Sequence, residues 1–291
     1  MPDMAEEIDP IVCSEVPASP LSTQQLGMPR GYHDVAFDGQ GHIIGSDGFA
    51  LVKVDADDNL SLFTPNLGMV QQMDWLDDGD LAIAVDATAS ILRIAPNGSS
   101  STIAADVGAY GLVTGDDGML YAANTTAVLR IDPDTGVKTT VVPNFGVSPR
   151  VLNFSPDNET LYIGTYLGNG SLYAVAWDAQ SMQPTGMPYV FATGVGGGAY
   201  HDTMPIDACG NLYVADFTTQ SMYRVTPEGE TSVYINFNVA GYGYGHGAEF
   251  GNGKGGLRED ALYIAQPYTG NSVTEVVIGV PSREYAWMTK P

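Results

Sequence analysis

Six polar side chains occupy one equivalent position in six copies of a repeated sequence phrase, and their types could do chemistry. The set comprises His33, Gln71, Tyr110, Arg150, Asp202 and His246. Placing such groups in a buried position is costly unless they pair with one another, bind a metal or meet a polar ligand. We therefore treat these six residues as the candidate site.

Two imidazoles and one carboxylate in this set could bind a divalent transition metal. His33, Asp202 and His246 offer the nitrogen and oxygen donors that zinc or iron takes in proteins, with positions left for water and substrate. A metal held in this way would activate water or polarise a carbonyl group. The residue types therefore predict one divalent metal at these three side chains.

The other three residues are candidates for catalysis. Arg150 could neutralise a developing oxyanion, and Tyr110 could act as an acid or a base. Gln71 completes the catalytic set. Together with the metal, they predict an enzyme that acts on a small organic molecule.

A purely structural alternative stays open for the same residues. Arg150 and Asp202 could form an ion pair to which the histidines hydrogen-bond. No single spacing motif such as His-x-x-x-His supports the metal. His201, directly before Asp202, is an alternate ligand, although alternation along a strand favours core packing for it.

The repeated phrase indicates which elements carry these residues. It reads apolar-x-apolar, one or two acidic or small residues, glycine and an apolar run, and it occurs at 35–47, 73–86, 112–124, 152–165, 204–216 and 248–265. Its turn positions Gly41, Gly79, Gly118 and Asn158 follow one another at intervals of about 40 residues, a period typical of propeller blades. Asp and Gly at the turn suit a tight hairpin. We predict an all-β fold, a six-bladed β-propeller.

A third apolar run follows each phrase and should form the next strand of the blade. These runs lie at 50–55, 90–96, 127–133, 171–178, 221–229 and 272–279. The first strand of every blade lines the central channel of a propeller, so the six candidate residues should form a ring around its mouth. Asp202, His246 and His33 then occupy the consecutive blades five, six and one, with Tyr110 and Arg150 on the opposite side.

Length and composition agree with one propeller domain. The chain has 291 residues with 35 Gly and 18 Pro, and a repeat array closed into a ring forms a single domain of this size. We expect an N-terminal arm at 1–30 and the propeller at 31–291. Either the arm around Ile11 and Val12 or the C-terminal segment 283–288 should close the ring. No apolar run approaches the roughly 18 residues that span a bilayer, which predicts a soluble chain without membrane insertion.

The net charge of −23, from 34 acidic and 11 basic residues, limits the partners. It argues against nucleic acid and anionic membranes, because both would be repelled. We expect a monomer that acts on a small-molecule substrate. The acidic arm and the scarcity of lysine favour a periplasmic or extracellular protein. Cys13 and Cys209 allow one disulfide between the arm and the propeller, or two separate thiols.

Two segments carry a resemblance to a known family. HDTMPIDACGNLYVAD at 201–216 and SPRVLNFSPDNETLYIG at 148–164 are similar to motifs of the gluconolactonase, senescence marker protein and luciferin-regenerating enzyme family. The resemblance covers roughly residues 31–280 as a blade pattern. It implies a six-bladed propeller that hydrolyses a lactone and holds one divalent metal, calcium, through a Glu of blade one, an Asn of blade four and an Asp of blade five. Asp202 matches that Asp.

The other two ligand positions depart from the family pattern. His33 to Phe37 replace the first-blade motif E-G-P-x-W, and Arg150 replaces the fourth-blade Asn. A guanidinium at a ligand position would repel calcium. The ligand types thus favour zinc or iron, whereas the resemblance implies calcium.

The reaction class also stays open. In its residue types, the combination of His, Arg and Tyr is similar to the peptidyl-hydroxyglycine amidating lyases, which are six-bladed propellers with channel histidines on zinc. A lyase is therefore the alternative to an ester or lactone hydrolase.

A non-catalytic ligand-binding or protein-binding propeller is a further alternative. The Gly-rich segments 193–200 and 240–246 lead into the ring positions of blades five and six. They could be lids that carry Tyr242 and Tyr244, or the glycines could merely allow a tight crossing between blades.

Overall fold

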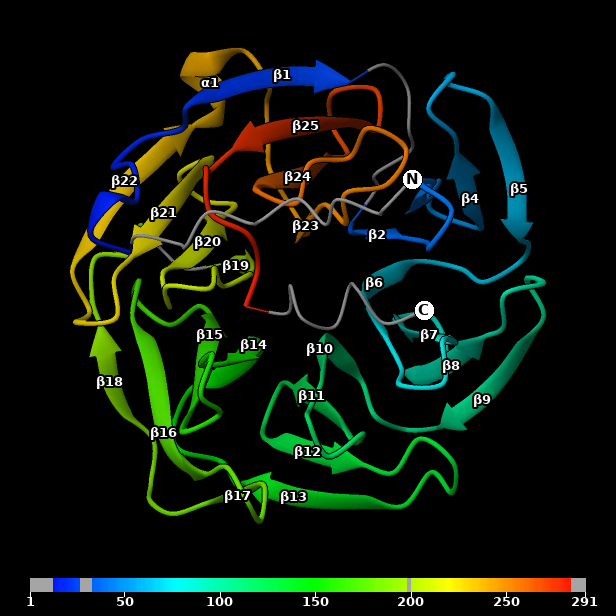
Figure 1. The fold of residues 1–291 in the computed structure, drawn as a ribbon. Helices are drawn as coiled ribbons and strands as arrows, with labels where there is room; N and C mark the ends of the chain where they lie inside the picture. The colour runs from blue at the N-terminus through cyan, green and yellow to red at the C-terminus, as the bar shows by residue number, and fades with distance from the viewer. Residues whose placement is uncertain (1–12, 27–32, 198–199, 284–291) are drawn as a thin grey trace, which may run out of the picture.

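Six antiparallel sheets surround a central axis in this protein (Figure 1). The computed structural model describes residues 13–26, 33–197 and 200–283. Each sheet is one blade, and the chain passes through the blades in sequence order. The expected all-β, six-bladed propeller is confirmed.

The innermost strands lie next to the axis and carry the start of each repeated phrase. They are β2 (Val35–Phe37), β6 (Val70–Trp75), β10 (Ala109–Thr114), β14 (Ser148–Phe154), β19 (His201–Thr203) and β23 (Ala248–Phe250). The second strands follow the turn and are almost entirely buried. They are β3 (Ile43–Ser46), β7 (Leu81–Val85), β11 (Leu120–Asn124), β15 (Thr160–Tyr166), β20 (Leu212–Asp216) and β24 (Ala261–Gln266).

The predicted third strands are confirmed, and a fourth strand lies outside each of them. The third strands are β4 (Leu51–Val54), β8 (Ser90–Ile94), β12 (Val128–Ile131), β16 (Leu172–Asp178), β21 (Ser221–Val225) and β25 (Ser272–Val277). The outermost strands are β5 (Leu60–Thr64), β9 (Ser100–Ala104), β13 (Lys138–Val142), β18 (Tyr189–Ala192), β22 (Thr231–Asn236) and β1 (Ser22–Leu26). Blade four also pairs the short strand β17 (Gln183–Pro184) with β16.

Turn residues between the first two strands adopt the left-handed conformation that the phrase predicts. Gly79 has φ 87° and Asn158 has φ 57°. Glycine and asparagine tolerate this region far better than other residues. Asn158 therefore replaces the glycine of the other repeats without changing the hairpin.

A basic residue on the third strand binds a polar side chain at the turn of its own blade. Arg130 Nη2 lies 2.7 Å from Asp117 Oδ2 in blade three, and Lys53 Nζ lies 3.0 Å from Asp38 Oδ2 in blade one. Arg224 donates to Asn211 Oδ1 in blade five. These contacts use several of the 11 basic residues and tie the turn to the outer half of the blade.

The N-terminal arm closes the ring. Strand β1 pairs antiparallel with β25 and becomes the outermost strand of blade six (Figure 1). Closure of this kind removes the free edge that an open array would expose. Ile11, Val12 and all but the first residue of the C-terminal segment 283–288 lie outside the described residues. The strand that pairs belongs to the predicted arm 1–30 and is Ser22–Leu26.

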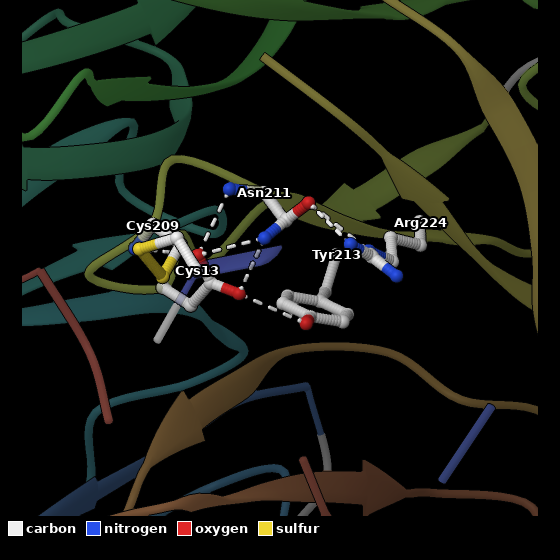
Figure 2. Close-up of a disulfide and its surroundings, with 6 residues drawn as sticks. Cys13, Cys209, Asn211, Tyr213 and Arg224 are labelled. Carbon is white, nitrogen blue, oxygen red and sulfur yellow. Dashed lines mark hydrogen bonds between the residues drawn. A yellow bond between two sulfur atoms is a disulfide. The ribbon is translucent and has the colours of Figure 1, made fainter. Parts of the chain in front are cut away.

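A disulfide fastens the arm to blade five. Cys13, at the start of the 3-10 turn Cys13–Glu15, is bonded to Cys209 in the turn of blade five (Figure 2). Asp207 organises this turn by accepting hydrogen bonds from the Cys209 and Asn211 backbones and from Tyr213 Oη. Of the two possibilities left open by the sequence, the structure has the bridge.

Apolar side chains fill the spaces between neighbouring blades. One cluster joins blades three and four through Tyr121, Phe154 and Trp177, whose rings meet edge to face. The single α-helix of the described residues, α1 (Phe237–Ala240), is one short turn after β22. None of the described helices has the length and apolarity needed to cross a bilayer.

Candidate functional site

Four of the six ring residues sit at irregularities of the innermost strands, whereas His33 and His246 lie just before β2 and β23. The β10–β11 register shifts between Ala109 and Gly111, so Tyr110 falls at the shift. Arg150 and Asp202 occupy the same place in blades four and five, and Gln71 lies within a two-residue shift in blade two. A bulge re-aims the side chain of its extra residue. The repeated bulge thus presents these side chains at the axis.

Asp202 is the centre of the hydrogen bonds in the ring. Its Oδ1 accepts from Arg150 Nη2 at 2.6 Å and Nε at 3.0 Å, and from Tyr110 Oη at 3.1 Å. Arg150 also stacks on Tyr110, with its guanidinium carbon 3.5 Å from the ring centroid. Arg150 and Tyr110 therefore bind the same carboxylate oxygen, and the ion pair of the structural alternative is present.

The second carboxylate oxygen faces a histidine. Asp202 Oδ2 lies 3.7 Å from His246 Nδ1, which is beyond hydrogen-bond distance. Among the described residues, neither Oδ2 nor either ring nitrogen of His246 has a hydrogen-bond partner, although all three are buried. The His33 and His246 rings meet edge to face at 4.9 Å. The structure thus brings together the three residues predicted as metal ligands.

Burial keeps both histidines neutral. It lowers the pKa of His33 from 6.5 to about 4 and that of His246 to about 3, with Arg150 adding a smaller effect in the same direction. Neutral imidazole has a lone pair that can accept a proton or bind a metal. At neutral pH these rings are therefore acceptors.

Burial has the opposite effect on the acids of the site. It raises the pKa of Asp202, while the nearby Arg150 and its hydrogen bonds oppose the rise. We assign Asp202 as ionised, because it lies in a close ion pair with Arg150. Burial raises the pKa of Tyr110 well above its usual value, so its hydroxyl stays protonated.

Gln72 closes the channel beneath the ring. Its side chain extends from blade two across the axis to blade five, where Nε2 donates to the Asp202 carbonyl at 3.3 Å, and its Oε1 accepts from Leu112 N. On its far side lies a small cavity of about 40 Å³ lined in part by Asp34, Asp74 and Asn153. A cavity of this size holds only a few waters. Gln72 therefore separates the ring from this cavity.

Gln71, the sixth ring residue, is buried beside Gln72. Its Oε1 has no hydrogen-bond partner among the described residues. A buried amide oxygen without a partner is uncommon and costs free energy. Gln71 therefore keeps a free acceptor at the site.

The donor set fits some metals better than others. Neutral imidazole and carboxylate are the ligands that zinc and iron take, and His246 and Asp202 hold such donors side by side. Calcium prefers six to eight oxygens, and here it would face Arg150. Within the described part of the chain, no group of three or more His, Cys, Asp or Glu side chains has a geometry that could hold a metal ion. A third donor would need a side-chain rotation of His33, a water or the substrate.

Two further polar residues next to the ring are structural. His201 Nδ1 accepts from Thr165 N at 3.0 Å, and its Nε2 lies 2.8 Å from the Val195 carbonyl, so both nitrogens are used in packing, as expected. Asp34 points between blades, where Oδ2 accepts from Met73 N at 2.8 Å. Neither side chain joins the ring.

The Gly-rich segments are shaped by close packing. A side chain at Gly245 would strike Phe237, and one at Gly247 would strike Asp34 and the His33 backbone. Tyr242 is held by its hydroxyl against Thr23 Oγ1 at 2.9 Å. For the described residues of the second segment, these contacts favour a tight crossing between blades over a lid.

Sequence reasoning missed two groups at this end of the channel. Gln72 was overlooked because the two-residue bulge places two successive glutamines near the axis. Aromatic residues also surround His246: the Phe217 ring lies 5.3 Å and the Tyr268 ring 5.7 Å from its imidazole. Their position in the repeat could have identified them, because Phe217 and Tyr268 each follow the second strand of their blade.

A family model supports the resemblance predicted from the sequence. The family described as "SMP-30/Gluconolactonase/LRE-like region" matches residues 104–241, which include Tyr110, Arg150 and Asp202. No curated protein matches the chain. The predicted family resemblance is confirmed over blades three to five.

Solved structures share the fold at low identity. A gluconolactonase from Xanthomonas campestris is 16% identical with TM-score 0.69, and the alignment covers 91% of each chain. A calcium-binding protein, regucalcin, from Agrobacterium tumefaciens is 17% identical with TM-score 0.66, over 92% of this chain and 93% of that one. Virginiamycin B lyase from Staphylococcus aureus is 16% identical with TM-score 0.61, over 88% and 99%. Identities this low establish a shared fold.

Proposed function

Because the chain is a six-bladed β-propeller with an SMP-30/gluconolactonase/LRE-like region over residues 104–241, we propose that it is a metal-dependent hydrolase. Its substrate is a small organic ester or lactone that binds at the mouth of the central channel. One observation carries the proposal: His246 and Asp202 place three buried polar atoms side by side, none of them hydrogen-bonded among the described residues. Such atoms are costly to bury unless a ligand or ion completes them.

The ring residues divide the work of ester hydrolysis. Water must add to the carbonyl carbon while the bond to the leaving oxygen breaks and that oxygen gains a proton. His33 and His246, neutral at physiological pH, have lone pairs that would bind the metal, and water acidified in this way would lose its proton to solvent. The ionised Asp202 beside His246 would supply the carboxylate ligand.

Arg150 and Tyr110 prepare the carboxylate and the leaving group. Together they occupy Asp202 Oδ1, which leaves Oδ2 toward His246. Tyr110 keeps its proton because its pKa is raised by burial, so it could protonate only a strongly basic leaving oxygen. Gln71 offers its amide oxygen to a donor on the substrate.

The metal would be held by Asp202 and His246, and by His33 once its side chain rotates toward them. When bound, a divalent ion such as zinc or iron would polarise the substrate carbonyl and acidify water. The neutral state of both imidazoles supports this assignment, because a protonated imidazole cannot bind a cation. Regucalcin is described as calcium-binding, but this donor set favours a softer ion.

The protein's compartment and partners belong to the same proposal. A disulfide between Cys13 and Cys209 persists in oxidising surroundings. We place the protein in a periplasm or outside the cell, as a monomer whose partner is the small substrate.

Elimination is the second candidate reaction. Virginiamycin B lyase shares the fold, and a neutral, buried imidazole can remove a proton from carbon as well as from water. The two reactions differ in their products, because hydrolysis adds one water to the mass of the substrate and elimination leaves the mass unchanged.

Lactone hydrolysis by purified protein tests the proposal. Metal-free protein is supplied in turn with zinc, ferrous iron or calcium, and turnover of dihydrocoumarin is followed by product mass. His246→Gln should lower kcat/KM at least about 100-fold, because it removes a proposed metal ligand, and loss of even a partner of a ligand costs roughly 10–100-fold. His42→Gln is the matched control, since His42 binds Asp38 in the turn of blade one, away from the ring.

The outcomes separate the three functions. Water added to the product, with loss in His246→Gln alone, supports the hydrolase. A new product of unchanged mass supports the lyase. This arm uses δ-valerolactone, because the aryl C–O bond of dihydrocoumarin cannot break by elimination. No turnover with any metal, in wild-type protein that is folded, rejects both and leaves the non-catalytic binding propeller.

A further inference from the structure

Five aromatic side chains form a continuous arc at the rim of the channel. They come from blades four, five and six and are Tyr166, Tyr200, Phe217, Tyr244 and Tyr268. Neighbouring rings along this aromatic arc lie 4.7 Å apart for Tyr166 and Tyr200, 6.2 Å for Tyr200 and Phe217, 4.7 Å for Phe217 and Tyr244, and 5.4 Å for Tyr244 and Tyr268.

The aromatic arc lies on one half of the rim. Tyr200 and Tyr244 each stand two residues before the ring residue of their blade, where blades two to four have other side chains. Those residues are Met69, Gly108 and Ser148. The rim is therefore asymmetric, which suits a ligand that must lie in one orientation across the ring.

Both ends of the aromatic arc contact the polar site. Phe217 and Tyr268 lie against His246, at ring distances of 5.3 and 5.7 Å. Tyr166 lies under the guanidinium of Arg150, which is 5.3 Å from its ring centroid. A molecule seated on the aromatic arc would therefore lie next to His246 and Arg150.

All five rings remain accessible to some degree. Tyr166, Tyr200, Phe217 and Tyr244 are partly buried, and Tyr268 is 61% exposed. Five of the six contacts along the arc and to His246 are edge to face, and only Phe217 and Tyr244 are stacked, at 28°. Alternating ring edges and faces suit a further aromatic ring, which pairs in either geometry at 4.5–7 Å.

The net charge of the protein limits the class of ligand that this site can bind. The protein carries a net charge of −23, which repels anions such as phosphorylated or carboxylated substrates. Arg150, whose guanidinium lies against Tyr166 of the aromatic arc, already forms an ion pair with Asp202. An uncharged molecule can enter this site without being repelled by the negative net charge of the protein.

We propose that the aromatic arc is the specificity subsite of the enzyme and binds an uncharged aryl group attached to the ester or lactone. This inference rests on the proposed function for the bond that is cleaved, but binding of the aryl group can be measured without cleavage. Phe217 and Tyr244 provide the stacked pair at its centre, and Tyr268 provides its outer edge.

Binding of two matched ethers tests the subsite. Chroman carries an aryl ring fused to an oxygen heterocycle, tetrahydropyran is the same heterocycle without the aryl ring, and neither can be hydrolysed. Ligand-observed NMR titration should show chroman binding to wild-type protein at least tenfold more tightly than tetrahydropyran. Phe217→Leu and Tyr268→Leu should each weaken chroman binding several-fold, while the control Tyr189→Leu, on the outer strand β18, should not change it.

Each result has one meaning. Equal binding of the two ethers, tighter binding of gluconolactone than of chroman, or chroman binding unchanged in both arc variants would overturn the subsite. Tyr268 is exposed, so its variant tests the proposal even if Phe217→Leu does not fold. Chroman binding through the aromatic arc without any lactone turnover supports the subsite and rejects the proposed function. Lactone turnover with no preference for dihydrocoumarin over δ-valerolactone supports the proposed function and rejects the subsite.

Discussion

Asp202 holds the charge balance of the site, because it is almost fully buried and bonded to Arg150 and Tyr110. A buried carboxylate that loses its only cation becomes an uncompensated charge. The Arg150–Asp202 pair therefore matters for folding as well as for chemistry.

Replacement of Arg150 should show this cost. We expect Arg150→Met to lower the free energy of unfolding by about 3–5 kcal/mol, the usual cost of breaking a buried pair from one side. Urea unfolding measures it. Arg258→Met is the control, since Arg258 pairs with Asp260 on the surface and such pairs contribute at most about 1 kcal/mol. Equal costs for the two variants would show that Asp202 is not ionised in the fold.

Acid should destabilise the metal-free protein through the two histidines. Their pKa values in the folded chain are about 4 for His33 and about 3 for His246, below the ordinary 6.5. The unfolded chain then binds protons more readily, so the stability present above pH 6.5 is lost as the pH falls toward 3. We expect the melting temperature to fall less between pH 7 and pH 4 for His246→Gln than for the wild type. Parallel curves for the two proteins would contradict the lowered pKa.

At the residue scale, the sequence predicted which side chains meet but not how they bond. A fixed register counted back from the turns identified all six ring residues. It could not show that bulges carry four of them, nor that Arg150 and Tyr110 converge on one oxygen of Asp202. Bulges and side-chain rotations depend on the three-dimensional packing of neighbouring blades, which no periodicity encodes.

At the scale of elements, the innermost strand and its turn were legible because their pattern repeats, while the outermost strands were not. Strands such as β9 (Ser100–Ala104) and β13 (Lys138–Val142) begin with three exposed, mostly Ser and Thr residues. Their only apolar signal is a buried pair at the end. A strand with one solvent-exposed face and no adjacent turn motif resembles a loop in sequence.

Loss of the disulfide should loosen the closure of the ring. The bridge joins residues 196 apart, and removal of a native disulfide typically costs about 2–5 kcal/mol. We expect Cys209→Ser, or reduction of the wild type, to lower the melting temperature. Reductant should have no effect on Cys209→Ser itself. A wild-type melting curve that reductant leaves unchanged would refute a stabilising bridge.

A side chain in the crossing segment should disturb the ring. Gly247 packs directly against Asp34 and the backbone of His33, so Gly247→Ala must displace one of them. We expect a loss of about 1–3 kcal/mol, as for overpacking elsewhere, together with reduced metal binding. Gly186→Ala is the control, because open space surrounds that position. Equal stability of the two variants in calorimetry would contradict this prediction, because it would mean that the backbone near Gly247 moves to accept a methyl group without cost.

At the scale of the whole molecule, the net charge of −23 opposes the compact fold by self-repulsion. Added salt screens this repulsion within about 10 Å at 0.1 M. We expect the melting temperature to rise by roughly 2–4 °C between 10 and 300 mM NaCl, equivalent to about 1 kcal/mol. Choline chloride should raise the melting temperature by a similar amount if screening is the cause. A falling melting temperature would mean that attractive ion pairs outweigh the repulsion.

The most direct measurement is the kcat/KM of dihydrocoumarin hydrolysis for the wild type, His246→Gln and His42→Gln, each with its metal content determined on the same sample. The account predicts a stoichiometric transition metal and turnover in the wild type and in His42→Gln, and at least a roughly 100-fold loss in His246→Gln. Equal turnover in all three proteins, or a metal that stays bound without His246, would contradict a catalytic site at the ring.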